Sequence, residues 1–327
     1  MYKVIKYIPR YLNSWNDLVE NSKNSTFLLN RNFIDYHKDQ FLDFSLVVID
    51  KKNKMVACMA ANYLNNREIE SHSGLSYGGV IFRKDVTLNN SLIIVKLILK
   101  MLLNVGIKNL HLKLLPDFYS KHPSQEIDYA LFLLKSKLTR TDTSLVINLS
   151  DKLNFQNRRI RSINKSDKYN FLIKSNDNFS DFWNKVLIPN LQERFDVSPV
   201  HSLEEIVFLK NFFPENIIQF NIYHKGVIVA GTTIFKTKNV AHIQYISSND
   251  FGRSSGALDF LFEKLINTYY NEMSFFDFGI CNENNGLQIN HGLLNWKESF
   301  GARTFVNKFH IVDCNNHVLL NSVINEN

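Results

Sequence analysis

The stretch QYISSNDFGRSSGALD, residues 244–259, decides the fold. It has the pattern of a β-strand end, a connection of small residues and the first turn of an amphipathic helix. Such a junction presents unpaired backbone N–H groups at the positive end of a helix dipole, which favours an anion. Arg253 adds guanidinium donors suited to phosphate. The stretch leaves a second interpretation open, in which its small residues serve only turn and capping geometry.

The spacing of the glycines in this stretch argues against two common phosphate-binding motifs. Gly252 and Gly256 do not have the spacing of a P-loop, and the Gly-x-Gly-x-x-Gly motif of dinucleotide-binding folds is absent from it. A phosphate here would therefore be held by backbone amides and one arginine.

Composition places the chain among large folded proteins. Its 327 residues suffice for two medium-sized domains, and 45% hydrophobic with 13% aromatic residues supports a substantial core. The net charge of +7 fits a phosphate-bearing small ligand and does not require a nucleic acid. The basic run at residues 158–161 lacks interleaved aromatic residues, so we expect a solvated interdomain helix there and not a base-stacking platform.

The cysteines and the apolar segments indicate the compartment. Cys58, Cys281 and Cys314 are far apart and form no Cys-x-x-Cys pair, so we expect no zinc site and a reducing environment. The N-terminus lacks the apolar run of a signal peptide. The longest apolar helix, near residues 92–105, is interrupted by two lysines and too short to span a bilayer. We therefore expect a soluble, cytoplasmic protein that does not bind membranes.

The same order of elements is predicted twice along the chain. Each half begins with helices, at residues 15–21 and 32–37 and at 179–194 and 202–212. Hairpin, strand, helix and strand then follow. In the first half these are strands 45–50, 55–63, 68–72 and 79–82, helix 88–103 and strand 109–114; in the second they are strands 218–223, 227–235 and 241–247, helix 255–270 and strand 275–278. This repetition predicts a duplicated α+β protein with domains at residues 1–155 and 156–327.

Three local strings carry a family resemblance. They are SGLSYGG at residues 73–79, SPVHSLEE at 198–205, and FDFGI at 276–280 followed by NHGLLNWKESFG at 290–301. With the element order and the junction at 244–259, the chain resembles tandem-GNAT, FemAB-like acyltransferases along nearly its whole length. The resemblance implies two GNAT-like domains, each with a mixed, mostly antiparallel sheet flanked by helices. The three strings look like those of the branch found among bacterial genes for O-antigen, capsule and lipopolysaccharide biosynthesis, which includes N-acyltransferases of nucleotide-linked amino sugars.

The resemblance also implies an acyl-CoA donor. In the GNAT fold the strand at residues 245–248 splays from its neighbour, and an amide aimed at the thioester oxygen would contribute about 3–4 kcal/mol to transition-state stabilisation. The implied CoA-binding residues are Tyr245, Ile246, Ser247, Ser248, Gly252, Arg253, Ser254, Ser255, Gly256, Ala257 and, for a phosphate, Lys297. Residues 83–87 are charged and contain no glycine. We therefore expect CoA in the C-terminal half and the acceptor pocket in the N-terminal half.

Three residues are candidates for the proton transfers. His201 could deprotonate the acceptor amine, because imidazole titrates near neutral pH; alternatively it caps or packs a helix. Asp277 and Glu283 flank Gly279 at a strand end, where a carboxylate could bind the amine or act as a base through water. The alternatives are a satisfied strand-end carboxylate for Asp277 and a solvated loop charge for Glu283.

The acceptor site is assigned to a further set of residues. Tyr77 could stack on a nucleotide base or bond a sugar hydroxyl, and its alternative is packing between domains. The substrate-binding set is Ser73, Tyr77, Tyr119, His122, Arg194 and Gly279.

Together these assignments predict a monomeric N-acyltransferase that uses no metal and no covalent intermediate. The acceptor implied by the resemblance is a dTDP-3-amino-3,6-dideoxyhexose, whose amine attacks the thioester directly. Two alternatives stay open: an aminoacyl-tRNA-dependent FemAB-like transferase, and a non-catalytic module that binds polysaccharide precursors.

Overall fold

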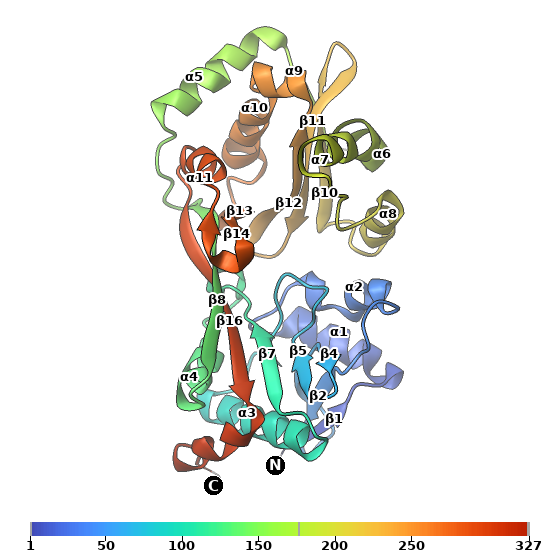
Figure 1. Ribbon diagram of the computed structural model, residues 1–327, viewed down its shortest axis with the longest axis vertical. Coiled ribbons are helices and arrows are strands. Elements are labelled where there is room, and N and C mark those ends of the chain that lie inside the picture. The colour runs from blue at the N-terminus through green and yellow to red at the C-terminus, as the bar shows by residue number, and fades with distance from the viewer. Residues whose placement is uncertain (1, 176, 326–327) are drawn as a thin grey trace. The chain divides into compact units, whose positions relative to one another are not determined.

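The computed structural model describes residues 2–175 and 177–325 (Figure 1). The chain forms two compact units. Unit 1 consists of Met1–Asp142 with Val306–Asn327, and unit 2 consists of Thr143–Phe305. Strands β8 (Lys137–Asn148) and β16 (Arg303–Asp313) each contribute residues to both units. The compact units therefore divide between Asp142 and Thr143, whereas the two repeats expected from the sequence meet at residues 155 and 156.

Unit 1 combines two sheets with helices. One sheet has the order β1-β2-β3-β6, and the other strands follow the order β4-β5-β7-β16. Its strands are β1 (Lys3–Lys6), β2 (Leu46–Ile49), β3 (Met55–Met59), β4 (Asn62–Asn65), β5 (Glu68–Glu70), β6 (Ile81–Phe82), β7 (Asn109–Lys113), the beginning of β8 and the end of β16. Its helices are η1 (Pro9–Tyr11), α1 (Leu12–Asn21), η2 (Phe27–Leu29), α2 (Arg31–Ile34), η3 (Asp35–His37), α3 (Leu88–Asn104), η4 (Asp117–Tyr119), α4 (Glu126–Leu133) and η9 (Cys314–Ser322).

The core of unit 1 lies around α3. The alternation in β7 directs Leu110 and Leu112 into this core together with Ile94 and Ile98 of α3. Helix α3 also packs against α4 and η9. The strand predicted over residues 55–63 is wrong as one element, because β3 and β4 belong to different sheets.

Unit 2 contains one main sheet with the order β8-β13-β12-β11-β10-β9 and a separate small β14–β15 hairpin. Its strands are the end of β8, β9 (Leu172–Ser175), β10 (Ile217–His224), β11 (Val227–Lys236), β12 (Val240–Ser248), β13 (Phe275–Ile280), β14 (Asn282–Glu283) and β15 (Gln288–Ile289). Its helices are α5 (Asn157–Ser166), η5 (Asp167–Tyr169), α6 (Phe179–Phe182), η6 (Trp183–Leu187), α7 (Ile188–Phe195), α8 (Leu203–Phe212), α9 (Asp250–Ser255), α10 (Ala257–Lys264), η7 (Leu265–Tyr269), η8 (Asn284–Gly286) and α11 (His291–Glu298).

Helices cover both faces of this sheet. The core that includes Leu261 and Phe262 of α10 takes Ala241 and Ile243 from β12 and Phe276 from β13. Elements α6 and η6 pack against β11, and η6 also packs against β12. The helix predicted at Ser202 does begin there, with a complete capping box between Ser202 and Glu205. Each unit thus has a mixed sheet with helices, which confirms the α+β architecture predicted from the sequence.

Helix α5 differs from its prediction as a solvated interdomain helix. It packs against α10 within unit 2 (Figure 1). Arg159 turns inward, is buried, and forms an ion pair with Asp259 of α10. The period of the helix explains the difference, because one arginine of the basic run faces the protein while its neighbours face solvent.

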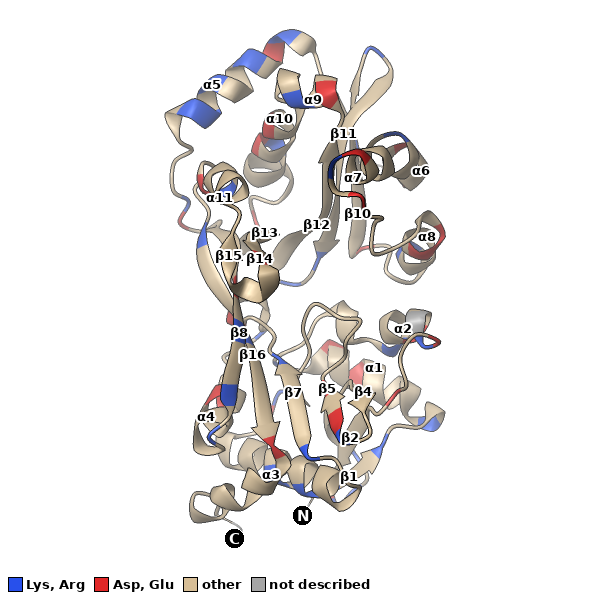
Figure 2. Ribbon diagram, viewed as in Figure 1, with Lys and Arg blue, Asp and Glu red and all other residues tan. Residues whose placement is uncertain are grey.

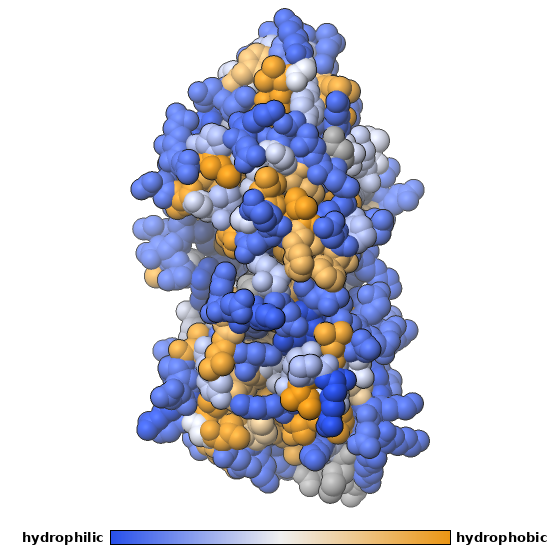
Figure 3. All heavy atoms as spheres, turned by 90° about the vertical axis from the view of Figure 1, so that its right-hand side faces the viewer, coloured by the Kyte–Doolittle hydropathy of each residue, from blue (hydrophilic) through white to orange (hydrophobic). Residues whose placement is uncertain are grey.

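Unit 2 also exposes apolar side chains along α7, α8 and the segment between them (Figure 3). The largest are Phe195, Val200, Phe208 and Phe212, with Val200 81% exposed. Single exposed apolar side chains are ordinary on protein surfaces, but several on one segment mark a surface suited to contact. This segment also contains two predicted site residues, Arg194 and His201.

Candidate active site

The site is built where two parallel strands of unit 2 separate. Strands β12 and β13 pair only at residues 240–242 and 275–277 among the residues described by the structure. Beyond that point β12 continues to Ser248 and pairs with β11. A bulge at Gln244 adds one residue to β12 opposite the Thr233–Ile234 step of β11. The diverging strands leave a stretch of β12 edge whose backbone can bind a ligand.

A histidine and an aspartate face each other at the last paired position. His242 and Asp277 are direct partners in the parallel register, and His242 Nδ1 lies 2.9 Å from Asp277 Oδ2. The Asp277 side chain is 3% exposed and the His242 side chain 23%. Ala241, Ile243 and Phe276 point into the core, so the alternation of the strands places His242 and Asp277 on the opposite face. Of this pair, the sequence predicted Asp277 alone.

The other oxygen of Asp277 is also held. Asp277 Oδ1 accepts hydrogen bonds from Ser144 Oγ and from the backbone N–H of Gly279, both at 2.7 Å. Gly279 has a φ of +72°, a conformation that glycine adopts readily. A carboxylate with several donors is stabilised in its charged form, so Asp277 can orient the imidazole with Nδ1 protonated. Gly279 therefore supports the carboxylate with its backbone.

Lys297 approaches the same turn from α11. The side chain is buried, and Nζ donates to the carbonyl oxygens of Gly279 at 2.9 Å and Ile280 at 2.7 Å. Burial lowers the pKa of Lys297 to about 8, and the charge of Asp277 opposes that shift. Its ammonium contacts backbone carbonyls in this structure, and its predicted contact with a phosphate stays a prediction.

His201 is placed against Tyr245 of β12. Its Nδ1 lies 2.5 Å from Tyr245 Oη, and its backbone N–H donates to the same oxygen at 3.0 Å. Trp183 Nε1 donates to the His201 carbonyl. Burial raises the pKa of Tyr245 to about 12. His201 is thus itself a buried residue tied to β12, which is the packing alternative considered for it; its catalytic role stays a prediction.

Glu283 lies outside the buried part of the site. It is an exposed residue of β14, and its Oε1 accepts a hydrogen bond from Asn290 Nδ2 at 2.8 Å. Its location agrees with a solvated hairpin charge, and its proposed role as a base is untested.

The expected phosphate loop at residues 252–257 is wrong as a loop. Asn249 caps helix α9 by accepting the N–H of Gly252, so residues 250–255 are helical. Gly256 then takes a left-handed conformation, and its N–H bonds to carbonyls of α9 before α10 begins at Ala257. The sequence signal for this helix was Asn249, a favoured N-cap residue at the start of the small-residue run.

Helix α5 covers this junction. A Cβ on Gly256 would lie 3.2 Å from Ser162 Oγ of α5. Asp259 anchors α5 by pairing with Arg159 and by accepting from Ser162 Oγ at 2.5 Å. Arg253 is exposed and donates to Asn190 Oδ1 at 3.1 Å. The CoA-binding roles of residues 252–257 therefore stay predictions on a junction that is helical and packed.

The predicted acceptor residues of unit 1 have different surroundings. Tyr77 and Tyr119 are buried with their rings 5.2 Å apart, and Tyr77 Oη lies 2.9 Å from Thr26 Oγ1. Ser73 Oγ donates to Glu70 at 2.8 Å, whereas His122 is exposed. In unit 2, Arg194 is exposed on α7 and lies over the Phe195 ring.

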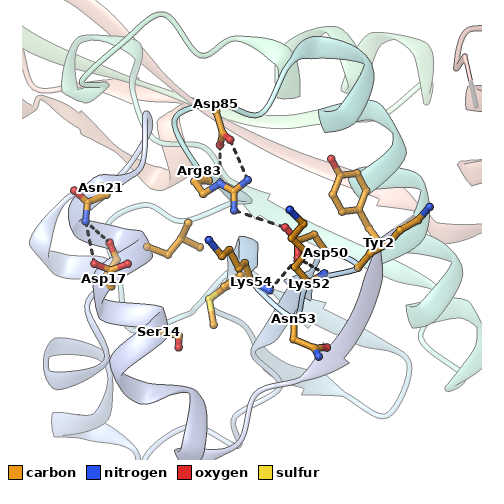
Figure 4. Close-up of a pocket in the computed structure, with 13 residues that line it drawn as sticks. Tyr2, Ser14, Asp17, Asn21, Asp50, Lys52, Asn53, Lys54, Arg83 and Asp85 are labelled. Carbon is orange, nitrogen blue, oxygen red and sulfur yellow. Dashed lines mark hydrogen bonds and ion pairs between the residues drawn. The ribbon is translucent and has the colours of Figure 1, made fainter. Parts of the chain in front are cut away.

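Unit 1 has a surface hollow of about 1030 Å³ beside α1 and the β2–β3 turn (Figure 4). Lysines 51, 52 and 54 line it, and Arg83 at its edge is paired with Asp85 at 2.6 Å. None of the predicted site residues is among the residues described as lining this hollow.

The described residues contain neither a metal-binding cluster nor a membrane-spanning helix. No group of three or more histidine, cysteine, aspartate or glutamate residues is arranged to hold a metal ion. No described helix combines the length and apolar character needed to cross a bilayer.

The comparisons with known proteins concern the fold. No protein-family model matches the chain, and no curated protein matches it either. Among solved structures, FemX is similar with a TM-score of 0.66 at 9% identity, covering 98% of this chain and 99% of FemX. L-PGS from Bacillus licheniformis has a TM-score of 0.60 at 11% identity, with 98% of each chain covered.

A tandem GNAT protein from the clavulanic acid biosynthesis pathway is also similar. Its TM-score is 0.50 at 9% identity, with 96% of this chain and 99% of that chain covered. These likenesses extend over whole chains, so this protein has the tandem-GNAT fold that the sequence predicted. At such low identity they establish the fold, and activity has to be argued from the site.

Proposed function

We propose that this protein is an N-acyltransferase that moves an acyl group from acyl-CoA to the amine of a nucleotide-linked amino sugar. The observation that carries the proposal is the His242–Asp277 pair at the point where β12 and β13 diverge. In that position an acyl group bound along the free edge of β12 would have a base beside it.

The chemistry needs a proton acceptor and an oxyanion donor. With Asp277 holding Nδ1–H, His242 would accept a proton from the acceptor ammonium at Nε2. The free amine then attacks the thioester carbonyl, a C–N bond forms, and the C–S bond breaks as the thiolate leaves. A backbone N–H of β12 aimed at the carbonyl oxygen would contribute about 3–4 kcal/mol to this step. His242 passes this first proton to solvent, and the second proton, which the nitrogen loses as the amide forms, protonates the departing thiolate.

The identity of the acceptor is supported by the sequence strings and not by geometry. The strings at residues 73–79, 198–205 and 276–301 resemble those of amino-sugar N-acyltransferases. A dTDP-3-amino-3,6-dideoxyhexose of a bacterial surface polysaccharide is the acceptor we propose. The net charge of +7 is compatible with such an anionic substrate.

A second donor, aminoacyl-tRNA, is favoured by two observations on α5. The helix covers the Gly256 junction where a CoA pyrophosphate was expected. The helix also carries the exposed residues Arg158, Arg161 and Lys165, and basic positions recur along α5 in Figure 2. A basic helix face can bind an RNA backbone, with an affinity that falls steeply with salt.

A thiol-release assay distinguishes the acyl-CoA donor from the aminoacyl-tRNA donor and from a non-catalytic module. The full-length protein is incubated with acetyl-CoA and a panel of dTDP- and UDP-linked amino sugars, with His242→Gln as the matched variant. We expect thiol release that requires an amino sugar and falls by about 10²–10⁴-fold in the variant. Transfer from aminoacyl-tRNA alone would instead establish the second donor. Sugar binding without transfer from either donor would indicate the non-catalytic module.

A further inference from the structure

Lys297 is a buried lysine whose ammonium contacts backbone carbonyls. It belongs to the last turn of α11 and is 5% exposed. A buried ammonium loses its hydration and needs hydrogen-bond acceptors to compensate. Lys297 Nζ obtains two from consecutive peptide groups, the carbonyls of Gly279 and Ile280.

Those two carbonyls belong to the turn that carries the carboxylate. Gly279 donates its N–H to Asp277 Oδ1 at 2.7 Å, while its carbonyl accepts from Lys297 at 2.9 Å. The backbone of Gly279 is therefore held at both its N–H and its carbonyl group. Asp277 in turn holds His242 Nδ1 through its second oxygen at 2.9 Å. A continuous chain of hydrogen bonds runs from α11 to the imidazole.

The buried charges of Asp277 and Lys297 are opposite in sign. Asp277 is the carboxylate whose charge acts on Lys297, and it is itself almost fully buried. A buried carboxylate next to a buried ammonium is far less costly than either charge alone. Ser144, on β8, supplies the remaining side-chain donor to Asp277.

We propose that Lys297 is a positioning residue that fixes the Gly279–Ile280 carbonyls and so holds Asp277 in the orientation that receives His242 Nδ1–H. Its catalytic meaning rests on the function proposed above, but the hydrogen-bond chain does not. The ammonium acts through the backbone of the turn and through its charge. A residue that displaces a base by about 1 Å can change a rate by about 10²-fold.

The experiment observes the imidazole directly in the absence of any substrate. The full-length protein is labelled with ¹⁵N-histidine, and the downfield proton of the carboxylate-bound Nδ1–H is assigned by its loss in His242→Gln. Lys297→Met removes the ammonium at similar length, and Lys297→Gln keeps a donor without the charge. Lys264→Met, on the partly exposed side chain of Lys264 in α10, is the matched control for loss of one lysine. Circular dichroism and thermal unfolding establish that each variant folds.

We expect the wild type and Lys264→Met to show the signal, and Lys297→Met to lose it while folded. If Lys297→Gln keeps part of the Nδ1–H signal, the part that is lost depends on the charge of the ammonium. An unchanged signal in both Lys297 variants overturns the inference, and failure of both to fold would reduce Lys297 to a general structural role and overturn it as well. In the transfer assay, Lys297→Met should lower kcat by about 10²-fold with KM within about twofold. A signal that responds as expected without any acyl transfer would refute the proposed function and leave the positioning role intact.

Discussion

The two units each contain a histidine–carboxylate pair across parallel strands, and the pairs differ in register and burial. In unit 2, His242 and Asp277 are direct partners, and their atoms lie 2.9 Å apart. In unit 1, His111 of β7 is opposite Glu70, and it approaches Glu68 at 3.6 Å from Nε2 to Oε2. The direct partners meet at hydrogen-bond distance, whereas the offset pair does not.

Burial separates the pairs further. The Asp277 side chain is 3% exposed, whereas that of Glu68 is 29% exposed. Hydrogen bonds from Asn109 and Asn65 are the main causes that lower the pKa of the Glu68 carboxyl, and His111 contributes less to that shift. A partly exposed pair of this kind contributes about 0–1 kcal/mol to stability. A duplicated fold has thus placed a histidine near a carboxylate twice, and of these two pairs only the direct pair with the buried carboxylate has the geometry of an oriented base.

The largest expected difference between the pairs is in catalysis. His242→Gln should lower kcat/KM for acyl transfer by about 10²–10⁴-fold, because it removes the proton acceptor. His111→Gln is the matched variant in unit 1 and should leave kcat/KM within about twofold. Steady-state thiol release measures both. Equal losses in the two variants would contradict the assignment of the base to unit 2.

Replacing the carboxylates tests orientation separately from proton acceptance. Asp277→Asn keeps the shape of the side chain but offers the imidazole an amide, which allows the wrong tautomer. We expect a loss of kcat of about 10³-fold, less than or equal to that of His242→Gln. Glu68→Gln in unit 1 should change kcat by less than about twofold. An Asp277→Asn enzyme with normal kcat would show that Asp277 is a satisfied strand-end carboxylate.

The buried lysine gives unit 2 a pH-dependent stability. The pKa of Lys297 is about 8 in the folded chain and 10.5 without the protein environment. Between these values the unfolded chain binds more protons, so this residue makes stability rise with pH. The shift of 10.5 − 8 = 2.5 units corresponds to at most about 3 kcal/mol gained from pH 8 to 10.5.

Urea unfolding of wild type and Lys297→Met at several pH values measures this contribution as a difference. The raised pKa of about 12 for Tyr245 and for Cys314 has the opposite effect on stability at high pH, but it is common to both proteins. We expect the stability difference between wild type and variant to shift toward the wild type as pH rises. A difference that is constant from pH 7 to 10 would contradict a buried ammonium at this position.

Features of this site that depend on neighbouring residues could be predicted from the sequence, whereas features that depend on contacts between distant residues could not. The tandem order of elements and the helix start at Ser202 follow from periodicity and capping residues, and the structure confirms them. Asp277 and Gly279 could be selected because they end a strand near the junction. His242 could not, because its importance arises from the parallel register of β12 with β13, which joins residues 35 positions apart. Lys297 was selected as a phosphate contact, and its burial and its bonds to the carbonyls of Gly279 and Ile280 depend on how α11 packs.

The stretch at residues 244–259 shows the same limit. Its strand and helix were predicted, yet the small residues between them formed a capped helix and not an open loop. Serine and glycine favour caps and turns as well as anion sites, so composition alone does not separate these outcomes. The structure shows the capped helix, and the helix α5 that packs against Gly256 comes from residues about ninety positions earlier in the chain.

The smallest expected effect distinguishes two glycines with the same backbone conformation. Gly279 in unit 2 and Gly106 in unit 1 have φ values of +72° and +89°. An alanine Cβ at Gly106 would meet no atom within 4 Å, and one at Gly279 would lie 3.4 Å from His242 Cε1. Both substitutions should lower the free energy of unfolding by about 1–2 kcal/mol, because each forces an L-residue into the left-handed region. Urea unfolding measures this common cost.

The difference between the two glycines should appear in function and not in stability. Gly279→Ala places a methyl group against the imidazole and disturbs the N–H that supports Asp277, so kcat should fall by about tenfold. Gly106→Ala follows α3 in unit 1 and should leave kcat unchanged within about twofold. If both variants lose the same stability and only Gly279→Ala loses activity, the turn between Asp277 and Lys297 serves the base. Equal activity in the two variants would leave Gly279 with a turn-forming role alone.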